Sequence, residues 1–254
     1  MEHPTHLESE GMILAPEKFY ILIEEDGPYL VFGNPPINQQ IITMNSDGDA
    51  WWYKEGQTFD NSKEPCALCR CGESRNKPFC DGSHSSADWE PELTASEKFD
   101  VKKAEIIEGP MLILSDNEEY CAYARFCDAK GRIWNIVEKA ETEDDIELVA
   151  REAGHCPAGR LIAWDRKTGK PMEPHFEPSI GIIQDPALKI SGPIWVRGGI
   201  RIKSENGKEY TVRNRVALCR CGQSSNKPFC NGAHASMRFR DGLPSLPKED
   251  GQVF

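Results

Sequence analysis

Two stretches of the chain are nearly identical, and together they limit what it can fold into. The first, residues 67–84, reads ALCRCGESRNKPFCDGSH; the second, residues 217–234, reads ALCRCGQSSNKPFCNGAH. They align over eighteen positions without a gap, which chance does not explain. A Gly-Pro turn and a short β-rich run precede each one, GPYLVFG at 27–33 and GPIWVRG at 192–198. The chain therefore contains two copies of one unit.

An unrelated segment separates the two units, so the order is repeat, insert, repeat. We predict a flexible start at 1–16, a first unit at 17–98, an inserted domain at 99–170 and a second unit at 171–254. The first unit carries about fifteen extra residues, near 46–61, in a polar loop before its motif. We expect the two units to pack as an internal pseudo-dimer, one supplying strands that cover the other.

Each copy of the repeat has metal-ligand chemistry, with the spacing C-x-C-x8-C-x3-H. The candidate ligands are Cys69, Cys71, Cys80 and His84 in the first copy and Cys219, Cys221, Cys230 and His234 in the second. Three thiolates and one imidazole suit either an iron–sulfur cluster or zinc. In a 2Fe–2S unit the two close cysteines would hold one iron, and the later cysteine and histidine the other. A zinc site of the Cys3His type would instead make the protein an interaction module.

The residue after the third cysteine is a good helix N-cap in both copies, Asp81 in the first and Asn231 in the second. We therefore predict a short helix that starts there, with the histidine in its first turn. Backbone amides at a helix start also favour an anionic group nearby.

The repeated motif closely resembles the CDGSH, or NEET, family, whose pattern is C-x-C-x2-[ST]-x3-P-x-C-D-G-x-H. The first copy matches every position, and the second departs only at Asn231, which replaces the aspartate. The resemblance implies a 2Fe–2S cluster on three cysteines and one histidine in each copy. It also implies electron transfer, cluster donation or redox sensing. Because each cluster has one histidine ligand, we expect both to become labile as the pH falls.

The insert contains three more cysteines, namely Cys121, Cys127 and Cys156. Their C-x5-C…Cys-Pro pattern resembles ferredoxins with one 3Fe–4S cluster and the divergent mono-cluster ferredoxin domains, with Ala124 in place of the middle cysteine. The resemblance implies a 3Fe–4S cluster on the three thiolates, or a 4Fe–4S cluster with His155 or Asp128 as a further ligand. The alternative is that the three cysteines merely pack in the core.

The secondary structure of the insert follows from its periodicity. Residues 142–153 carry apolar side chains at i, i+3, i+4 and i+7, and Thr142 is a good cap, so we predict a helix there. Residues 132–137 predict a strand.

Composition sets the broad class of the chain. Its 18 prolines and 21 glycines favour an α+β fold of mostly short strands with few helices: two β-rich CDGSH units and a small ferredoxin-like domain. The net charge of −11 argues against nucleic acid as a partner.

No apolar run is long enough to cross a membrane and no secretory signal is visible, so we expect a cytoplasmic monomer. Clustered cysteines in a reducing compartment indicate metal rather than disulfides.

No nucleophile–base pair, phosphate-binding loop or nucleotide fingerprint is visible in the sequence. We therefore expect an electron carrier with redox protein partners rather than an enzyme. A cluster donor, or a sensor of redox state or pH, is the alternative.

Overall fold

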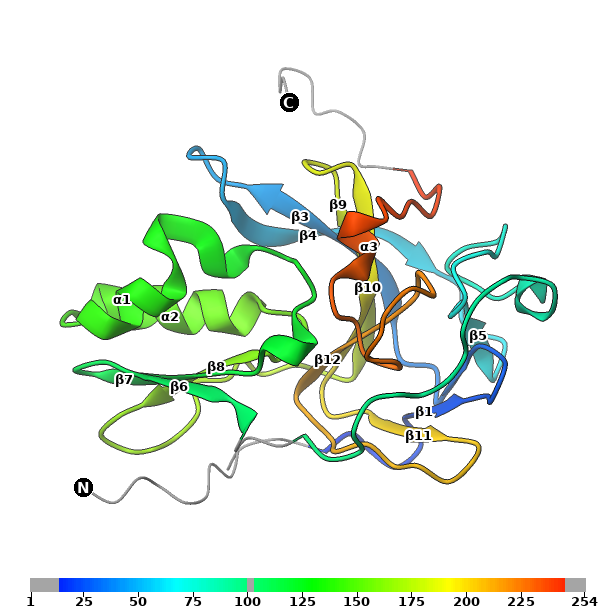
Figure 1. The fold of residues 1–254 in the computed structure, drawn as a ribbon, viewed down its shortest axis with the longest axis horizontal. Helices are drawn as coiled ribbons and strands as arrows, with labels where there is room; N and C mark the ends of the chain where they lie inside the picture. The colour runs from blue at the N-terminus through cyan, green and yellow to red at the C-terminus, as the bar shows by residue number, and fades with distance from the viewer. Residues whose placement is uncertain (1–13, 100–102, 245–254) are drawn as a thin grey trace.

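The computed structural model describes residues 14–99 and 103–244 (Figure 1). It contains mostly strands and few helices, which confirms the predicted α+β class. The strands are β1 (Tyr20–Ile23), β2 (Tyr29–Phe32), β3 (Ile37–Met44), β4 (Ala50–Phe59), β5 (Cys66–Leu68), β6 (Glu105–Glu108), β7 (Leu112–Asp116), β8 (Leu161–Asp165), β9 (Ser179–Asp185), β10 (Ile190–Arg197), β11 (Arg201–Ser204) and β12 (Arg215–Leu218). The helices are α1 (Ile133–Lys139), α2 (Glu143–His155) and α3 (Ala233–Ser236).

The two repeat units exchange strands. Sheet order is β11-β1-β2-β5 in one sheet and β12-β10-β9-β3-β4 in the other. Strand β1 of the first unit pairs in parallel with β11 of the second, and β9 of the second pairs in parallel with β3 of the first. Both sheets therefore contain strands from both units, and neither unit forms a sheet by itself.

Within each unit, the strand that follows the Gly-Pro turn leads to the cysteine motif in the same way. Strand β2 pairs antiparallel with β5, with Tyr29 opposite Leu68. In the second unit β10 pairs antiparallel with β12, with Ile194 opposite Leu218. The repeat seen in the sequence is thus a repeat of strand register, and it places the two motifs equivalently.

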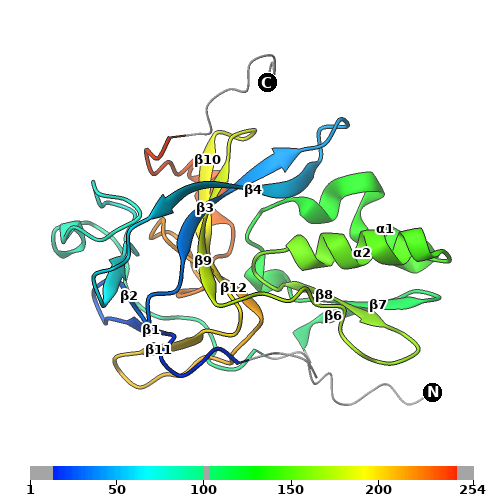
Figure 2. The same ribbon diagram turned by 180° about the vertical axis from the view of Figure 1, so that it is seen from behind.

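The extra residues of the first unit form a strand and not the polar loop that we predicted. Strands β3 and β4 make a long antiparallel hairpin at the edge of the five-stranded sheet, seen from behind in Figure 2. The turn is closed by Asn45, whose side-chain oxygen accepts hydrogen bonds from the backbone N–H groups of Asp47 and Asp49. In the described part of the second unit, no strand corresponds to β4.

The inserted segment has a sheet and a core of its own. Strands β6, β7 and β8 form an antiparallel sheet, and α1 and α2 cover one of its faces (Figure 1). The predicted helix is confirmed: α2 starts after Thr142, whose side chain and that of Asp145 form a reciprocal capping box.

The predicted strand at 132–137 is wrong, because these residues lie in helix α1. Ile133 and Val137 are four residues apart and both fully buried, so a helix places them on one face against the sheet. A strand would also have placed Asn135 on that face, between Ile133 and Val137, but Asn135 is exposed.

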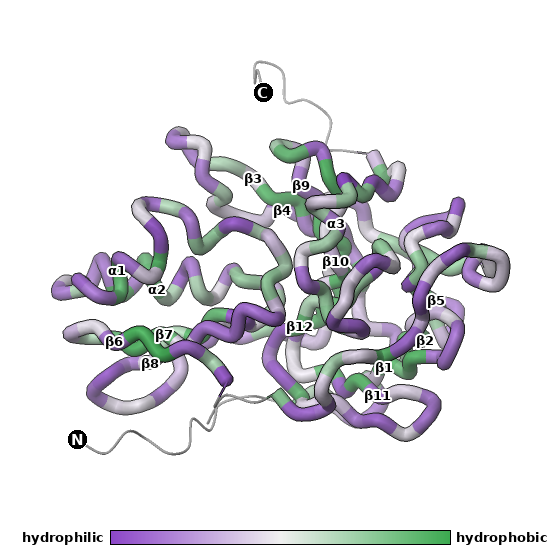
Figure 3. Tube along the Cα trace, in the orientation of Figure 1, coloured by the Kyte–Doolittle hydropathy of each residue, from purple (hydrophilic) through white to green (hydrophobic). Residues whose placement is uncertain are grey.

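The hydrophobic segments lie mainly along the interior strands, whereas most connecting loops are hydrophilic (Figure 3). One large core is shared by both repeat units, and it includes Ile21, Val31, Ile182 and Ile194. Ala15 is buried at its edge and donates its backbone N–H to the carbonyl of Gly199, so the predicted flexible start does not extend to this residue. None of the helices in the described ranges is long and apolar enough to span a bilayer.

A buried arginine joins the second unit to the insert. Arg215 is 1% exposed and donates to the backbone carbonyls of Cys156, Ala153 and Leu161 over 2.7–2.9 Å. It also forms an ion pair with Glu173. Its guanidinium therefore fixes the chain on both sides of Cys156.

We expect Arg215→Met to lower the free energy of unfolding by about 3 kcal/mol or more, because it leaves three carbonyls and Glu173 without their buried donor. Urea unfolding measures this. Arg201→Met is the matched control, because Arg201 is partly buried and makes one hydrogen bond, to Ala15. It should cost about 1 kcal/mol; equal losses for the two variants would contradict the assignment.

Candidate metal centres

The structure brings the four candidate ligands of the first motif together as two pairs. The sulfur atoms of Cys69 and Cys71 are 3.8 Å apart, and the Cys80 sulfur lies 3.2 Å from Nδ1 of His84. The loop closes because the backbone N–H of Cys69 donates to Pro78 and that of Cys80 donates to Ala67. These two bonds carry the second pair back beside the first.

The second motif has the same geometry. The sulfur atoms of Cys219 and Cys221 are 3.7 Å apart, and the Cys230 sulfur lies 3.3 Å from Nδ1 of His234. A tetrahedral metal with metal–sulfur bonds of about 2.3 Å holds two thiolates about 3.8 Å apart. The cysteine pairs of both motifs therefore fit a metal without rearrangement. Across the described ranges, no three His, Cys, Asp or Glu side chains lie close enough together to hold a single metal ion.

In each motif the first cysteine is favoured as a thiolate, whereas the pKa values of the other two are raised by that neighbour or by burial. The pKa of Cys69 is lowered to about 6 by the hydrogen bond from Cys71 and by the N–H groups of Ser74 and Gly72. The pKa of Cys219 is likewise lowered to about 6, with Cys221 as the largest cause. Thiolate is the form that binds metal.

Repeated residues that are not ligands hold the loops in shape. Ser74 donates its hydroxyl to the carbonyl of Phe79, and Lys77 donates to the carbonyl of Ser74. Ser224 and Lys227 make the same two bonds in the second copy, where Lys227 is buried. Each lysine thus stabilises the loop of its motif through this hydrogen bond.

The short helices after the third cysteine start later than predicted. They span Ser83–Ser85 and Ala233–Ser236, and a glycine occupies each cap position. Asp81 and Asn231 lie one residue earlier, and their side-chain oxygens accept the N–H of Ser83 and Ala233. Each histidine does lie in the first turn, as expected.

Sequence reasoning missed the arginine between the first two cysteines of each motif. Arg70 is 1% exposed and donates to the carbonyls of Gly27, Pro91, Glu24 and Glu25. In the second copy Arg220 donates to Gly192 and Ile183 and pairs with Asp241. Their presence in both copies was the signal that could have identified them.

The two motif loops touch through their backbones. A Cβ atom on Gly72 would lie 2.7 Å from the carbonyl oxygen of Cys221, and one on Gly222 would lie 2.3 Å from that of Cys71. Tyr29 strengthens this contact, because its hydroxyl donates to the carbonyl of Cys219 at 2.7 Å. The two motifs are therefore neighbours in space although they lie far apart in the chain.

The surroundings of the two motifs differ. Cys80 and His84 are partly exposed, whereas Cys230 and His234 are only 2% and 3% exposed. Burial, with a smaller contribution from Arg220, lowers the pKa of His234 to about 4.

The insert and the segment after α3 cover the second motif. A Cβ atom on Gly232 would lie 3.0 Å from the carbonyl oxygen of Cys121 and 3.5 Å from the Cβ of Tyr123. The backbone N–H of Phe239 donates to the carbonyl of His234.

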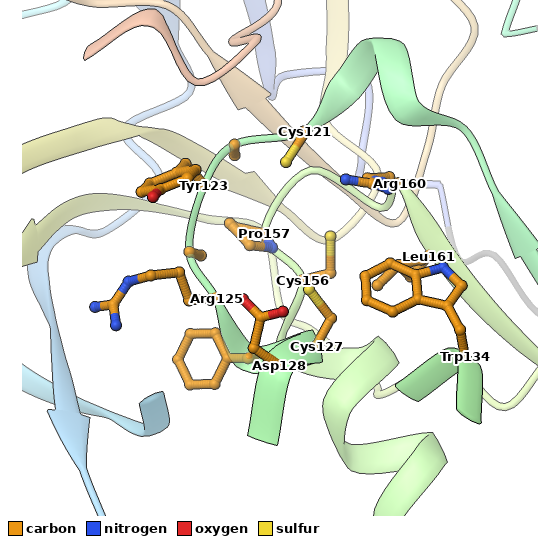
Figure 4. Close-up of a pocket in the computed structure, with 13 residues that line it drawn as sticks. Cys121, Tyr123, Arg125, Cys127, Asp128, Trp134, Cys156, Pro157, Arg160 and Leu161 are labelled. Carbon is orange, nitrogen blue, oxygen red and sulfur yellow. The ribbon is translucent and has the colours of Figure 1, made fainter. Parts of the chain in front are cut away.

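The three cysteines of the insert line a common cavity of about 160 Å³ (Figure 4). Cys127 and Cys156 lie close together, and Cys121 faces them from the opposite side with Arg160 beside it. Cys121 ends a single helical turn, Cys127 follows Phe126, and Cys156 follows the end of α2. Three separate segments therefore bring their cysteines to one cavity, as a cluster site requires.

Arg160 lines the cavity and forms a two-point ion pair with Asp116. Burial works against its charged form, but the hydrogen bond and charge of Asp116, with a further contribution from Cys121, raise the pKa of Arg160. Trp134 also donates to Asp116, at 2.9 Å. The guanidinium therefore lies beside Cys121 with its charge compensated by Asp116.

The structure separates the two candidates for a further ligand. Asp128 lines the cavity. The Nδ1 atom of His155 lies 2.7 Å from the carbonyl oxygen of Arg151, and its ring packs among Trp52, Tyr53 and Phe126. His155 is therefore directed away from the three cysteines.

Cys66, the tenth cysteine, is not placed as a ligand. It lies opposite Val31 in the sheet, is 5% exposed and belongs to the shared core. Burial raises the pKa of its thiol to about 11, so it stays protonated and packs as an apolar residue.

Comparison with known protein families agrees with this geometry. The family described as "Iron-binding zinc finger CDGSH type" matches residues 26–85 and 191–235, which include both repeated motifs. The family described as "Divergent 4Fe-4S mono-cluster" matches residues 107–166, which include the three central cysteines. No curated protein and no solved structure matches the chain.

Two iron-binding motifs and a cluster-binding segment define an iron–sulfur protein. In this chain two segments that match the CDGSH family enclose a segment that matches the divergent 4Fe–4S mono-cluster family.

The glycine contact between the loops gives a test. Gly222→Ala combines an unfavourable backbone conformation, φ +76°, with a clash against Cys71. Gly48→Ala is the matched control, because Gly48 has φ +84° and nothing within 4 Å of the added Cβ. We expect the control to lose about 1 kcal/mol of stability and to keep its iron. Gly222→Ala should lose more stability and a large part of its bound iron; if the variants behave alike, the loops do not depend on this contact.

Proposed function

We propose that the protein is a multi-cluster electron carrier, with a 2Fe–2S cluster at each CDGSH motif and a 3Fe–4S cluster at the central cysteines. The proposed ligands are Cys69, Cys71, Cys80, His84, Cys219, Cys221, Cys230 and His234 for the 2Fe–2S clusters and Cys121, Cys127 and Cys156 for the central one. When bound, such clusters take up and release single electrons.

One observation carries the proposal: the three ligand sets form a continuous row. The first motif contacts the second at Gly72 and Gly222, and the second contacts the central set where Gly232 meets the carbonyl of Cys121. The second motif therefore touches both other sets. Three redox-capable sites in backbone contact favour internal electron exchange over three unrelated structural sites.

The chain's own residues supply different surroundings along this row. Partial exposure of Cys80 and His84 leaves the first site open to a partner. Burial of Cys230 and His234 keeps water from the second site. Arg160, ion-paired with Asp116, lies beside Cys121 at the central one. These surroundings favour docking at the first site and protection at the other two.

The central cluster is proposed as 3Fe–4S because the chain supplies three thiolates there. The matching family is described as 4Fe–4S, and in that alternative Asp128 would be the further ligand, since it lines the same cavity.

We further propose that the protein acts with redox protein partners and has no enzymatic activity of its own. Its net charge of −11 favours partners with a basic docking face.

A second candidate function, cluster donation or pH sensing, is favoured by the partial exposure of the first ligand set. Cys80 and His84 can be reached by solvent or by an acceptor protein. Rapid transfer of a cluster to an apo-ferredoxin, followed by absorbance, would favour cluster donation over electron transfer.

The decisive experiment is to measure iron, zinc and acid-labile sulfide per chain on anaerobically purified protein. We expect about seven irons and about eight sulfides. About four irons would leave the central cysteines as packing residues, and zinc without sulfide would overturn the redox proposal. A stepwise redox titration followed by electron paramagnetic resonance then tests electron uptake.

A count of about eight irons would indicate the 4Fe–4S alternative. In that case Asp128→Ala should return the count to about seven, whereas Asp144→Ala, on the exposed start of α2, should not change it.

We expect acid to release the first CDGSH cluster before the second. Water reaches His84, whereas burial lowers the pKa of His234 to about 4 and keeps that imidazole neutral. A histidine that has left its cluster is protonated below about pH 6.5. The second cluster should therefore be fully retained above that pH and should be lost as the pH falls from there toward 4. Visible absorbance at about pH 5.5 should therefore decay in two phases.

Replacement of each histidine assigns the phases. His84→Cys should remove the fast phase and His234→Cys should leave it in place. If His234→Cys removed the fast phase instead, the burial argument would be wrong.

A further inference from the structure

A second, larger cavity lies between the inserted segment and the five-stranded sheet. Its volume is about 670 Å³, within the usual range for small-molecule sites. Its walls come from α2, from the segment after β8, and from strands β3, β4 and β10. The proposed iron–sulfur sites do not use it.

The walls of this cavity are largely aromatic. Tyr53 and Trp195 pack with ring centroids 4.6 Å apart, and Phe176 meets Trp195 edge-on at 5.5 Å. Trp52 also lines the cavity, packs against His155 at 4.8 Å and is 56% exposed. Rings arranged in this way favour a flat, conjugated ligand over a flexible or branched one.

Two donors buried in the wall of this cavity lack a hydrogen-bond partner. The guanidinium of Arg197 lies over the ring of Trp195, 4.7 Å from its centroid. Neither Nε of Arg197 nor Nε1 of Trp195 has a hydrogen-bond partner among the described residues. Each acid of the lining has a partner through one oxygen, because Glu173 pairs with Arg215 and Glu55 accepts from Asn38. This part of the wall therefore suits acceptor oxygens, once a small rotation of Arg197 or Trp195 turns its unpaired donor toward the cavity.

Only one layer of aromatic side chains separates this cavity from the central cysteines. Phe126 lines the cysteine cavity and packs on Tyr53, with ring centroids 4.7 Å apart. His155, which lines the large cavity, directly precedes Cys156.

Two of the walls also come from parts of the chain that are additional to the repeat. Strand β4, with Trp52 and Tyr53, has no counterpart among the described strands of the second unit, and α2 belongs to the insert. The extra hairpin and the insert together create this cavity.

We propose that the cavity binds a planar conjugated molecule with carbonyl or anionic oxygens, the class that includes flavins and quinones. The aromatic walls select planarity, and Arg197 with Trp195 selects the oxygens. The choice of a redox-active ligand rests on the proposed function, because it follows from the position beside the central cysteines.

The test uses the full-length protein with its iron and sulfide measured in each preparation. Flavin mononucleotide and menadione, a naphthoquinone, are titrated separately and binding is followed by calorimetry. We expect saturable binding of at least one of them at one site per chain. If only the flavin or only the quinone binds, the result identifies which of these two ligand classes the cavity accepts.

Variants tie the binding to the cavity. Arg197→Gln should weaken binding about tenfold or more, since it removes a charged donor. Trp52→Ala should also weaken binding because it removes an aromatic wall. Arg201→Gln is the matched arginine control on β11, outside the cavity, and should leave affinity unchanged.

Two outcomes would overturn the inference: no binding of either probe to protein that carries its iron and sulfide, or binding that Arg197→Gln and Trp52→Ala leave unaltered. In both cases the electron-carrier proposal would stand. Protein without iron or sulfide that still binds a probe through Arg197 would refute the carrier proposal and keep the cavity assignment.

Discussion

Parallel pairing between strands of different repeat units underlies the whole arrangement. Strand β1 requires β11, and β9 requires β3, so the hydrogen bonds of each unit are completed only by the other. The same pairing forms one shared hydrophobic core. It also brings the two motif loops into backbone contact, where a side chain larger than glycine would collide with the opposite loop. Ligand geometry within each motif is local, but the proximity of the motifs depends on this exchange.

The local parts of the structure could be predicted from the sequence. The ligand spacing determines a loop that returns on itself, and its donors do lie in pairs. Helix α2 was predicted because Thr142 and the apolar periodicity agree with one another. Residues 132–137 were misassigned because a short apolar run fits a strand and a helix equally well, and packing of Ile133 and Val137 against the sheet decided the outcome.

The contacts between distant segments could not be predicted in the same way. The extra residues of the first unit were predicted as a loop because of their polar ends, but they include the aromatic run Trp51–Tyr53 and gain strand partners in β3. Nothing in the sequence near His155 shows that its ring turns toward Trp52 and Tyr53 instead of toward Cys156. Likewise, the burial of His234 depends on residues 121–123, which are distant in the sequence, and on Phe239, which follows the motif. Such features follow from tertiary packing rather than from local pattern.

The unequal burial of the two motifs has a consequence for how such a chain can diversify. In a homodimer, two identical subunits must give both sites the same environment, and any substitution acts on both at once. Here both motifs belong to one polypeptide, so an insertion between them covers one and leaves the other exposed. A single mutation, such as the aspartate-to-asparagine difference at Asn231, then alters one site alone. Because the two halves are covalently joined, each site can have its own burial and its own neighbouring residues, which a symmetric homodimer does not allow.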